Sequence, residues 1–313
     1  MEVSRSFPHR MLISLLSVAG VFLGIGALVQ PAAADNLIEN FPAGSGPCGM
    51  AFDGGNIWVA DYTGGVITKL RASDGVALDI IPLGTLPYWA AFDGANVWVT
   101  VRGDNAVTKI RASDDTVLGK FHVELTPEKL VFDGTNIWVA NYSSGTVTQL
   151  RASDGERLRD VSVGGAPFGI TFDGINIWVA NGSASVTKFR ARDGAPRGTF
   201  NAGQFPVDIA FDGSKIWVAN YSGNSVSILR AVDGAPLRNF ATDSAPVAFA
   251  FAGGHMWLAH ALADEVTIHR GRDGHLLQTL DVQDNPQGVL FDGTSIWVAN
   301  FGSNTVSKIT HTE

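Results

Sequence analysis

One tryptophan recurs at a nearly constant spacing along most of this chain, and this constrains the fold more than any other feature. The intervals between successive copies are 40, 40, 40, 39, 40 and 40 residues. A proline keeps the same spacing, eleven residues before each tryptophan. Two residue types in one register over seven periods identify a repeat array, in which each repeat is one supersecondary unit. The tryptophans are Trp58, Trp98, Trp138, Trp178, Trp217, Trp257 and Trp297.

A single repeat, taken over residues 166–203, has the pattern of four short strands. The runs 168–172, 176–181, 185–190 and 197–200 are rich in β-branched and aromatic residues that alternate between two faces. Turn signals such as Asp173-Gly174 and Asp193-Gly194 separate them. No run has the spacing of a helix. The pattern predicts a four-stranded antiparallel meander of the size of one propeller blade.

Seven such units predict an all-β fold, a seven-bladed β-propeller over residues 35–313. The last repeat shows only three strands before Glu313, whereas residues 37–43 match the fourth strand of other repeats. We therefore expect the N-terminal strand to complete the last blade and close the ring. An open solenoid would instead need polar caps at its ends, and the sequence shows none.

The regularly repeated residues are explained by this fold. We expect each tryptophan, with a phenylalanine six residues before it, to pack between adjacent blades. Aspartates that precede glycine are typical of turns, and the asparagines after the tryptophan strand suit its end. Arginines three residues before an aspartate predict ion pairs at the rim; they are Arg71, Arg111, Arg151, Arg230 and Arg270. None of these repeated residues is therefore a preferred candidate for a functional site.

Residues 1–34 do not belong to the array and have the features of a signal peptide. Arg5 and Arg10 precede an apolar run over 11–29, and Pro31-Ala32-Ala33-Ala34 offers a small-residue cleavage site. This segment predicts a secreted or periplasmic protein. The alternative is an uncleaved membrane anchor, in which case the membrane would be contacted only through this segment.

The charge of the chain argues against nucleic acid as a partner. The formal net charge is −8, and the remainder is slightly more acidic once the two arginines and one glutamate of residues 1–34 are removed. Such a protein is not suited to neutralising phosphates. Cys48 is the single cysteine, so no internal disulfide can form. We interpret it as a small apolar residue at the start of a strand, and we expect a monomer.

The repeat has the form P-x-G-I-x-F-D-G-x-N-I-W-V-A-N-x-x-S-x-T-V-T-K-L. It resembles the YVTN-type and NHL-type bacterial β-propeller repeats, and it is similar to the repeats of the streptogramin B lyase (virginiamycin B lyase) group. The resemblance covers residues 35–313 and implies the propeller fold. For function it implies either a binding protein or a lyase or lactonase. The lyases use histidine and glutamate with a divalent cation at the ring centre, and the equivalent loops here carry no matching set.

Candidate binding residues are those that depart from the repeat in the loops of one face. In a propeller, the loops before the first strand and after the second open on the same face, at the mouth of the central channel. Tyr88 and Trp89 follow one proline, Lys129 follows the next, and Arg102 replaces a repeated residue. We predict that Trp89 stacks a ring or a sugar, and that Arg102 and Lys129 hold an anionic group.

Candidate catalytic residues lie in the same loops. Glu128 or Asp208, together with His260, could act as acid and base. The competing interpretation is repeat drift on a solvated face, with Glu128 and Lys129 in water. The leading hypothesis is a binding module for a small molecule, glycan or protein. The alternatives are a streptogramin-lyase-like or lactonase-like enzyme on the same face and a purely structural envelope protein.

Histidines are concentrated in the sixth repeat, at positions 255, 260, 269 and 275. The strand pattern places His260 at the upper end of the second strand, with His255 and His275 near the lower turns. They are therefore expected to be split between faces, which argues against one three-ligand metal centre. No metal or cofactor is predicted, except a divalent cation under the enzyme alternative.

Overall fold

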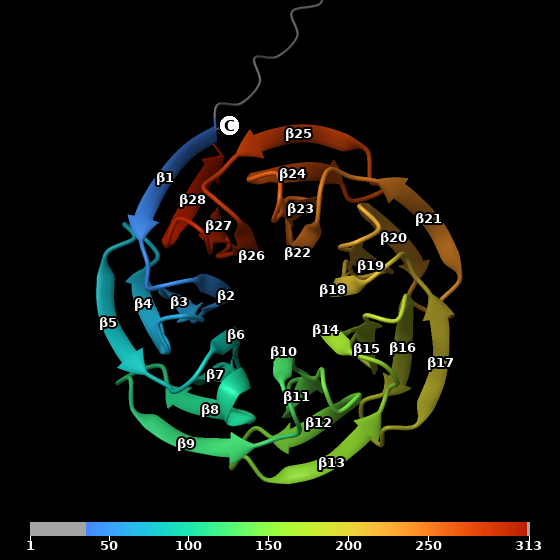
Figure 1. The fold of residues 1–313 in the computed structure, drawn as a ribbon, viewed down its shortest axis with the longest axis horizontal. Coiled ribbons are helices and arrows are strands. Elements are labelled where there is room, and N and C mark those ends of the chain that lie inside the picture. Colours follow the sequence, from blue (N-terminus) through green and yellow to red (C-terminus); the bar gives the residue numbers. More distant parts are fainter. Residues whose placement is uncertain (1–35, 312–313) are drawn as a thin grey trace, which may run out of the picture. The chain divides into compact units, whose positions relative to one another are not determined.

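The computed structural model describes residues 36–311, which form a ring of seven four-stranded antiparallel sheets. Each sheet is one blade, and the blades follow one another around the ring in chain order (Figure 1). The predicted all-β, seven-bladed propeller is confirmed. The predicted leader, residues 1–34, lies outside the described residues, so its cleavage stays a prediction.

The first strand of each blade lies nearest the centre of the ring, and the second strand is its neighbour (Figure 1). The first strands are β2 (Pro47–Phe52), β6 (Pro87–Phe92), β10 (Pro127–Phe132), β14 (Pro167–Phe172), β18 (Pro206–Phe211), β22 (Pro246–Ala252) and β26 (Pro286–Phe291). The second strands are β3 (Asn56–Asp61), β7 (Asn96–Val101), β11 (Asn136–Asn141), β15 (Asn176–Asn181), β19 (Lys215–Asn220), β23 (His255–His260) and β27 (Ser295–Asn300).

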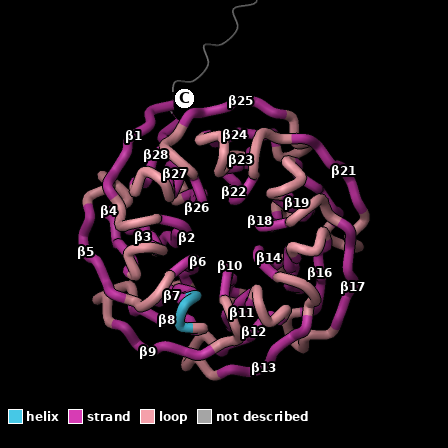
Figure 2. The backbone as a smooth tube through the Cα atoms, viewed as in Figure 1, coloured by secondary structure: helices cyan, strands magenta, loops and turns pink. Residues whose placement is uncertain are grey.

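The third and fourth strands continue each blade outward. The third strands are β4 (Val66–Arg71), β8 (Ala106–Arg111), β12 (Thr146–Arg151), β16 (Ser185–Arg190), β20 (Ser225–Arg230), β24 (Glu265–Arg270) and β28 (Thr305–His311). The outermost strands are β5 (Ala77–Pro82), β9 (Val117–His122), β13 (Arg157–Ser162), β17 (Pro196–Asn201), β21 (Pro236–Ala241), β25 (Leu276–Asp281) and β1 (Asn36–Pro42). Figure 2 shows one short helical segment between β7 and β8, the 3-10 turn η1 (Arg102–Asp104).

The N-terminal strand closes the ring. β1 pairs antiparallel with β28, from Asn36 opposite His311 to Pro42 opposite Thr305, so the last blade has the strand order β1-β28-β27-β26. In Figure 1 the blue strand β1 lies beside the red strand β28. The predicted completion of the last blade is therefore confirmed, and the outer edge of β28 is paired.

The repeated tryptophans pack between blades, as expected. Trp58 belongs to one apolar cluster with Val97 and Val99 of the next blade, and Trp178 contacts Ile209 and Ile216 in the same way. Six of the seven are 0% exposed, and Trp257 is 6% exposed. Each fully buried indole contributes roughly 4–6 kcal/mol of gross hydrophobic stabilisation.

The aspartate before each turn does more than shape the turn. Asp93 accepts backbone N–H groups of residues 95 and 96 through Oδ1, and its Oδ2 accepts the indole N–H of Trp98 at 2.7 Å. The same bond from tryptophan to aspartate, at 2.7–2.8 Å, is made in six blades. The blade that lacks it is the sixth, where Ala252 occupies the aspartate position. One carboxylate thus ties the turn to the core of the blade.

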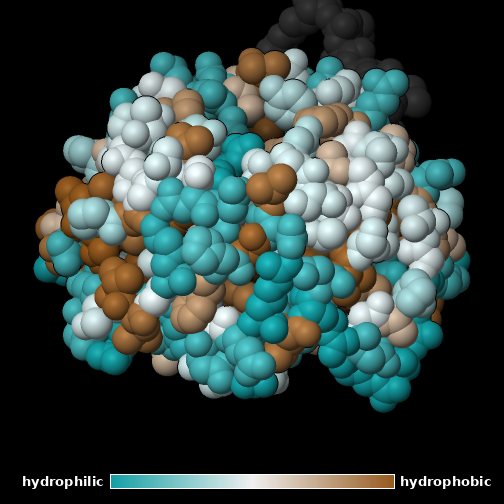
Figure 3. All heavy atoms as spheres, turned by 60° about the horizontal axis from the view of Figure 1, so that its bottom comes forward, coloured by the Kyte–Doolittle hydropathy of each residue, from teal (hydrophilic) through white to brown (hydrophobic). Residues whose placement is uncertain are grey.

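The outer surface carries the predicted arginine–aspartate pairs and scattered apolar side chains. Arg71–Asp74 and Arg111–Asp114 each have an N–O distance of 2.8 Å. Figure 3 shows apolar side chains as separate patches among hydrophilic ones. Within residues 36–311, no helix has the length and hydrophobicity that a membrane-spanning segment requires.

Candidate functional site

The residues that depart from the repeat on the inner strands come together around the ring centre. Each inner strand begins with proline and has a β-bulge in its first residues, as in β6, β10 and β18, and such bulges re-aim side chains. The third position of the strand is small in other blades, for example Gly49 and Gly169. A Cβ atom at Gly49 would lie 2.5 Å from the Cα of Trp89, so the small residues leave room for the large ones.

Arg102 and Glu128 form an ion pair at this centre, in which the carboxylate is buried and the guanidinium is partly exposed. Arg102 belongs to η1 in the second blade and Glu128 to β10 in the third. Arg102 Nη2 lies 2.8 Å from Glu128 Oε1, and the side chain of Glu128 is 0% exposed. The guanidinium also lies 5.1 Å from the ring centroid of Tyr88 and 5.6 Å from that of Tyr62. It is therefore held between a carboxylate and two aromatic rings.

Lys129 and Asp208 form a second buried pair, between blades three and five. Lys129 Nζ lies 2.8 Å from Asp208 Oδ1, and the two side chains are 4% and 9% exposed. The same ammonium lies 3.8 Å from the ring centroid of Trp89. Asp208 Oδ2 accepts the backbone N–H of Phe249 at 2.9 Å. The interpretation of Glu128 and Lys129 as solvated side chains is wrong, because the inner strands bury both.

An arc of aromatic rings lies beside these charges. Tyr62 and Tyr88 have ring centroids 6.1 Å apart, Tyr88 and Phe168 6.3 Å, and Phe168 and Phe205 6.3 Å. Edge-to-face contacts of this kind are favourable for aromatic side chains. The arc borders a cavity of about 300 Å³, whose lining residues are Tyr88, Lys129, Phe168, Phe205, Val207, Tyr221, Val247 and Gln287. We call this cavity and the two ion pairs the central site.

The central site combines two cations with two anions, and burial shifts the pKa of one of each, Glu128 and Lys129. Burial raises the pKa of Glu128 to about 7, although the charges of Arg102 and Lys129 oppose this. Burial lowers the pKa of Lys129, and Asp208 opposes that shift. Tyr88 has a pKa well above its usual value, because of burial and then the Glu128 charge. Each cation already contacts a carboxylate, so an incoming anion would have to compete with that partner.

Glu128 has unused hydrogen-bonding capacity. Arg102 lies within ionic distance of Oε1, but neither carboxylate oxygen accepts a well-aligned hydrogen bond from the described residues. Nearby, burial raises the pKa of Asp61 to about 7 and that of the Cys48 thiol to about 12. Cys48 is 2% exposed on β2, in agreement with its interpretation as an apolar strand residue.

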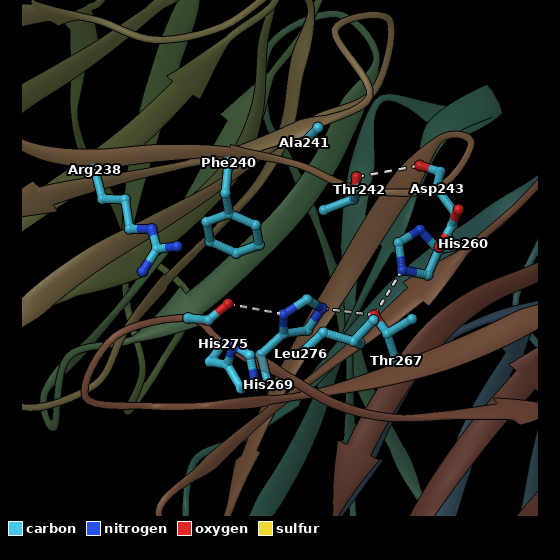
Figure 4. A pocket seen from close by; sticks show the side chains of 11 residues that line it. Arg238, Phe240, Ala241, Thr242, Asp243, His260, Thr267, His269, His275 and Leu276 are labelled. Carbon is cyan, nitrogen blue, oxygen red and sulfur yellow. Dashed lines mark hydrogen bonds between the residues drawn. The ribbon is translucent and has the colours of Figure 1, made fainter.

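His260 is not part of the central site. It is 0% exposed at the end of β23, and its Nε2 lies 2.7 Å from Thr267 Oγ1 (Figure 4). Asparagine makes the equivalent bond in other blades, for example from Asn141 to Thr148 at 2.8 Å. Burial lowers the pKa of His260 to about 4. The imidazole thus replaces a repeated cross-strand hydrogen bond.

Three of the four sixth-blade histidines lie together, which was not expected, whereas His255 lines a different cavity. Figure 4 shows His260 and His269 on either side of the Thr267 hydroxyl, and His269 Nε2 lies 2.9 Å from it. With His275 they line a cavity of about 390 Å³. Residues 265, 267 and 269 alternate along β24 and share one face, and their cross-strand partners include His260. This alternation was visible in the sequence.

The described residues do not fit the divalent cation that the lyase resemblance implies. Glu128 contacts Arg102, Asp208 contacts Lys129, and His260 contacts Thr267. No group of three or more His, Cys, Asp or Glu side chains suited to a metal ion occurs within residues 36–311. The predicted acid and base candidates are therefore dispersed between two ion pairs and a separate hydrogen bond.

Sequence reasoning missed most of the aromatic arc. Tyr62, Tyr142, Tyr221 and Phe301 each follow the last residue of a second strand, and this recurrence was visible in the repeat. Tyr142 contacts Phe168 with centroids 5.5 Å apart, and Tyr221 contacts Phe205 at 6.3 Å. In the ring this position lies beside the inner strands, where it adds to the aromatic side chains of the centre.

The fold and the site together define a seven-bladed β-propeller with an aromatic-lined centre. Comparisons with known protein families and with curated proteins found no match to the sequence. Among solved structures, a chain of Kuenenia stuttgartiensis hydrazine synthase is similar to this one, with a TM-score of 0.75 and 18% sequence identity. The similarity covers 85% of this chain and 96% of that chain. At this identity the likeness supports the fold alone.

Proposed function

We propose that this protein is a binding module that takes up an uncharged, ring-bearing ligand at the central site. The observation that carries the proposal is the cavity of about 300 Å³ lined by Tyr88, Phe168, Phe205 and Tyr221. Its volume is at the lower end of the range for small-molecule sites, and such sites combine aromatic walls with a few polar groups. Aromatic faces and edges suit the flat face of another ring or of a sugar.

The charge balance supports an uncharged ligand. Arg102 and Lys129 are neutralised by Glu128 and Asp208 at 2.8 Å in each pair. Removing one partner of a buried pair is strongly unfavourable, so a ligand anion would gain little by displacing either carboxylate. Gln287 lines the cavity, and its amide offers both a donor and an acceptor, which suits a ligand that carries a hydroxyl group.

Binding is favoured over the enzyme alternative by the separation of the acid and base candidates among different partners. We also propose that the repeats are related to YVTN-type and NHL-type repeats and to those of streptogramin B lyases. The repeat pattern supports this relation. We also propose a secreted or periplasmic location, which the leader-like composition of residues 1–34 supports.

The proposal is tested by calorimetric titration with two matched probes. The first is 4-nitrophenyl β-D-glucoside, which is neutral and presents an aromatic ring and hydroxyl groups. The second is 4-nitrophenyl phosphate, which keeps the ring but is anionic. We expect saturable binding of the glucoside, and binding of the phosphate at least about tenfold weaker.

Substitutions in the cavity wall test whether the glucoside binds in this cavity. Phe168→Ala and Tyr221→Ala each remove one wall of the cavity and should weaken glucoside binding about tenfold. Ile175→Ala is the control, because Ile175 is 67% exposed and does not line the cavity. The proposal fails if neither probe binds, if the phosphate binds more tightly, or if both aromatic variants bind like the native protein.

A further inference from the structure

The sixth blade lacks the carboxylate that holds the tryptophan in every other blade. Trp217 and Trp297 donate their indole N–H groups to Asp212 and Asp292 at 2.8 and 2.7 Å. In the sixth blade this position is Ala252. The indole N–H of Trp257 has no acceptor among the described residues, and its nitrogen is not one of the fully buried atoms that lack a partner, so it opens on solvent although only 6% of the residue is exposed. It is therefore free to donate to an oxygen that enters from outside.

The sixth blade also lacks a cation over the tryptophan ring, which five of the described blades have; the third blade, with Gln149 opposite Trp138, is the other that lacks it. Lys69, Lys109, Lys188 and Lys308 lie over the tryptophan of their own blade, with Nζ 4.5–5.3 Å from a ring centroid. Each also donates to a backbone carbonyl of the next blade, for example Lys308 to Ala72 at 2.8 Å. The corresponding residue of the sixth blade is Ile268, in the register that pairs it with Trp257.

The fifth blade shows that a missing lysine can be replaced from the neighbouring strand. It has Ile228 at this position, but Lys215 at the start of β19 bonds to Gly271 of the next blade at 2.8 Å. Lys215 Nζ lies 5.8 Å from the Trp217 ring. In the sixth blade the first residue of the second strand is His255, and no lysine or arginine within residues 36–311 lies over Trp257.

These two losses coincide with a cavity of about 330 Å³ between the sixth and seventh blades. Its apolar wall includes Ile268, Phe291, Ile296 and Ile309, and Trp257 and His255 also line it. The comparable space between blades three and four is lined instead by Asp133, Arg190, Arg192 and Arg197 among others. The cavity at Trp257 is thus apolar, whereas the groove beside blade three is charged, although Gln149 replaces the lysine in that blade. We call it the blade-six pocket.

The turn next to the pocket does not depend on a carboxylate. In other blades the aspartate accepts backbone N–H groups of the turn, and only the first turn glycine, such as Gly94 at φ 98°, has a positive φ. In the sixth blade Gly253 and Gly254 have φ values of 57° and 77°. Two successive positive φ values are those of a type I′ turn, which closes a hairpin without side-chain help. The hairpin therefore keeps its shape although Ala252 replaces the aspartate.

We infer that the blade-six pocket binds a small, uncharged apolar molecule that carries one hydrogen-bond acceptor oxygen, such as an aromatic ketone, ester or amide. The apolar body fills the space beside Ile268, Ile296 and Phe291. The oxygen accepts the indole N–H of Trp257, as the aspartate carboxylate does in other blades. A neutral oxygen suits the site, because its lining, as far as the structure describes the chain, contains no lysine or arginine. The pocket shares no lining residue with the central site.

The test uses two probes that differ in the acceptor alone. Acetophenone carries a ketone oxygen, and ethylbenzene has a similar ring and chain without it. Binding is followed by the indole N–H resonances of 15N-labelled protein, and Trp257→Phe assigns the resonance of Trp257. We expect a saturable shift of this resonance with acetophenone, and ethylbenzene binding about three- to tenfold weaker, the difference that one hydrogen bond makes.

Restoring the regular repeat should abolish binding. Ala252→Asp supplies the missing carboxylate, which would take the Trp257 N–H and occupy the acceptor position. Ile268→Lys independently places a cation over the ring and provides a second variant should the first fail to fold. Val232→Asp is the matched control for an added negative charge, since Val232 is 78% exposed and does not line the pocket. The control should bind acetophenone like the native protein.

The inference is overturned by any of three results. These are the absence of a saturable Trp257 shift in native protein, equal binding of the two probes, and unchanged acetophenone binding in a folded Ala252→Asp or Ile268→Lys variant. Loss of glucoside binding at the central site would leave all three measurements unaffected, so the two proposals fail separately.

Discussion

At the scale of single residues, the irregular positions show what each repeated side chain does. His260 replaces a repeated asparagine, and its bond to Thr267 at 2.7 Å corresponds to that of Asn300 to Ser307 at 2.8 Å. Ala252 replaces a repeated aspartate, and the Trp257 N–H then has no partner in the part of the chain that the structure describes. In one case the substitution conserves a hydrogen bond, and in the other it leaves a cavity.

His260→Asn should make the protein more resistant to acid. Burial lowers the pKa of His260 to about 4, from 6.5 in a solvated histidine. The unfolded state therefore binds more protons than the folded state between pH 6.5 and 4, and stability falls as pH falls through that window. Asparagine removes this loss and restores the repeated bond.

The measurement is urea unfolding of the native protein and the variant at pH 5 and pH 8. We expect the two to differ by less than about 1 kcal/mol at pH 8, and the variant to be relatively more stable at pH 5. An equal dependence on pH in both proteins would show that His260 is not buried in its neutral form.

At the scale of secondary-structure elements, most of the fold could be predicted because the information is local. The strand 176–181 is predicted with the same bounds as β15, since an Asp-Gly turn precedes it and its residues alternate. The site could not be predicted in the same way. Lys129 and Asp208 come from blades that are not adjacent in the ring, and their ion pair depends on how seven inner strands converge.

Deleting residues 36–45 should sharply destabilise the propeller. The deletion removes β1, and with it the strand that pairs with β28 from Asn36–His311 to Pro42–Thr305. It also removes Phe41, whose ring centroid lies 5.9 Å from that of Trp297. We expect the melting temperature to fall by more than about 10 °C, because a whole blade edge and several kilocalories per mole of packing are lost.

The melting temperatures of the native protein and the deletion variant are measured by circular dichroism during heating. Replacing residues 36–45 by a Gly/Ser segment of the same length controls for chain length, and should be as unstable as the deletion. A melting temperature within about 2 °C of the native value would show that β1 does not contribute to ring stability.

At the scale of the whole molecule, ionisation of buried carboxylates in different blades makes the folded protein less stable as the pH rises. The pKa of Asp61 and that of Glu128 are both raised to about 7, chiefly by burial. A carboxyl group whose pKa is raised in the folded state makes its full contribution to stability at pH values below its pKa in the unfolded state. This contribution is lost as pH rises through the folded value.

We expect native stability to decrease between pH 6 and pH 9, on the order of 1–3 kcal/mol in total. The double variant Asp61→Asn/Glu128→Gln should lose much less over the same range, since its amides do not ionise. Guanidinium unfolding at pH 6 and pH 9 measures the stability of the native protein and of the double variant. A native protein as stable at pH 9 as at pH 6 would contradict the prediction.

The way the ring is joined has a mechanical consequence. Asn36 and His311 lie opposite each other at one end of the β1–β28 pair. Tension applied between these two residues would open the seven-residue strand β1 from that end. Its hydrogen bonds would break one after another, because the load is not shared in shear. The β1–β28 pair closes the ring in the folded protein. It is thus also the place where a pulling force would first open the fold.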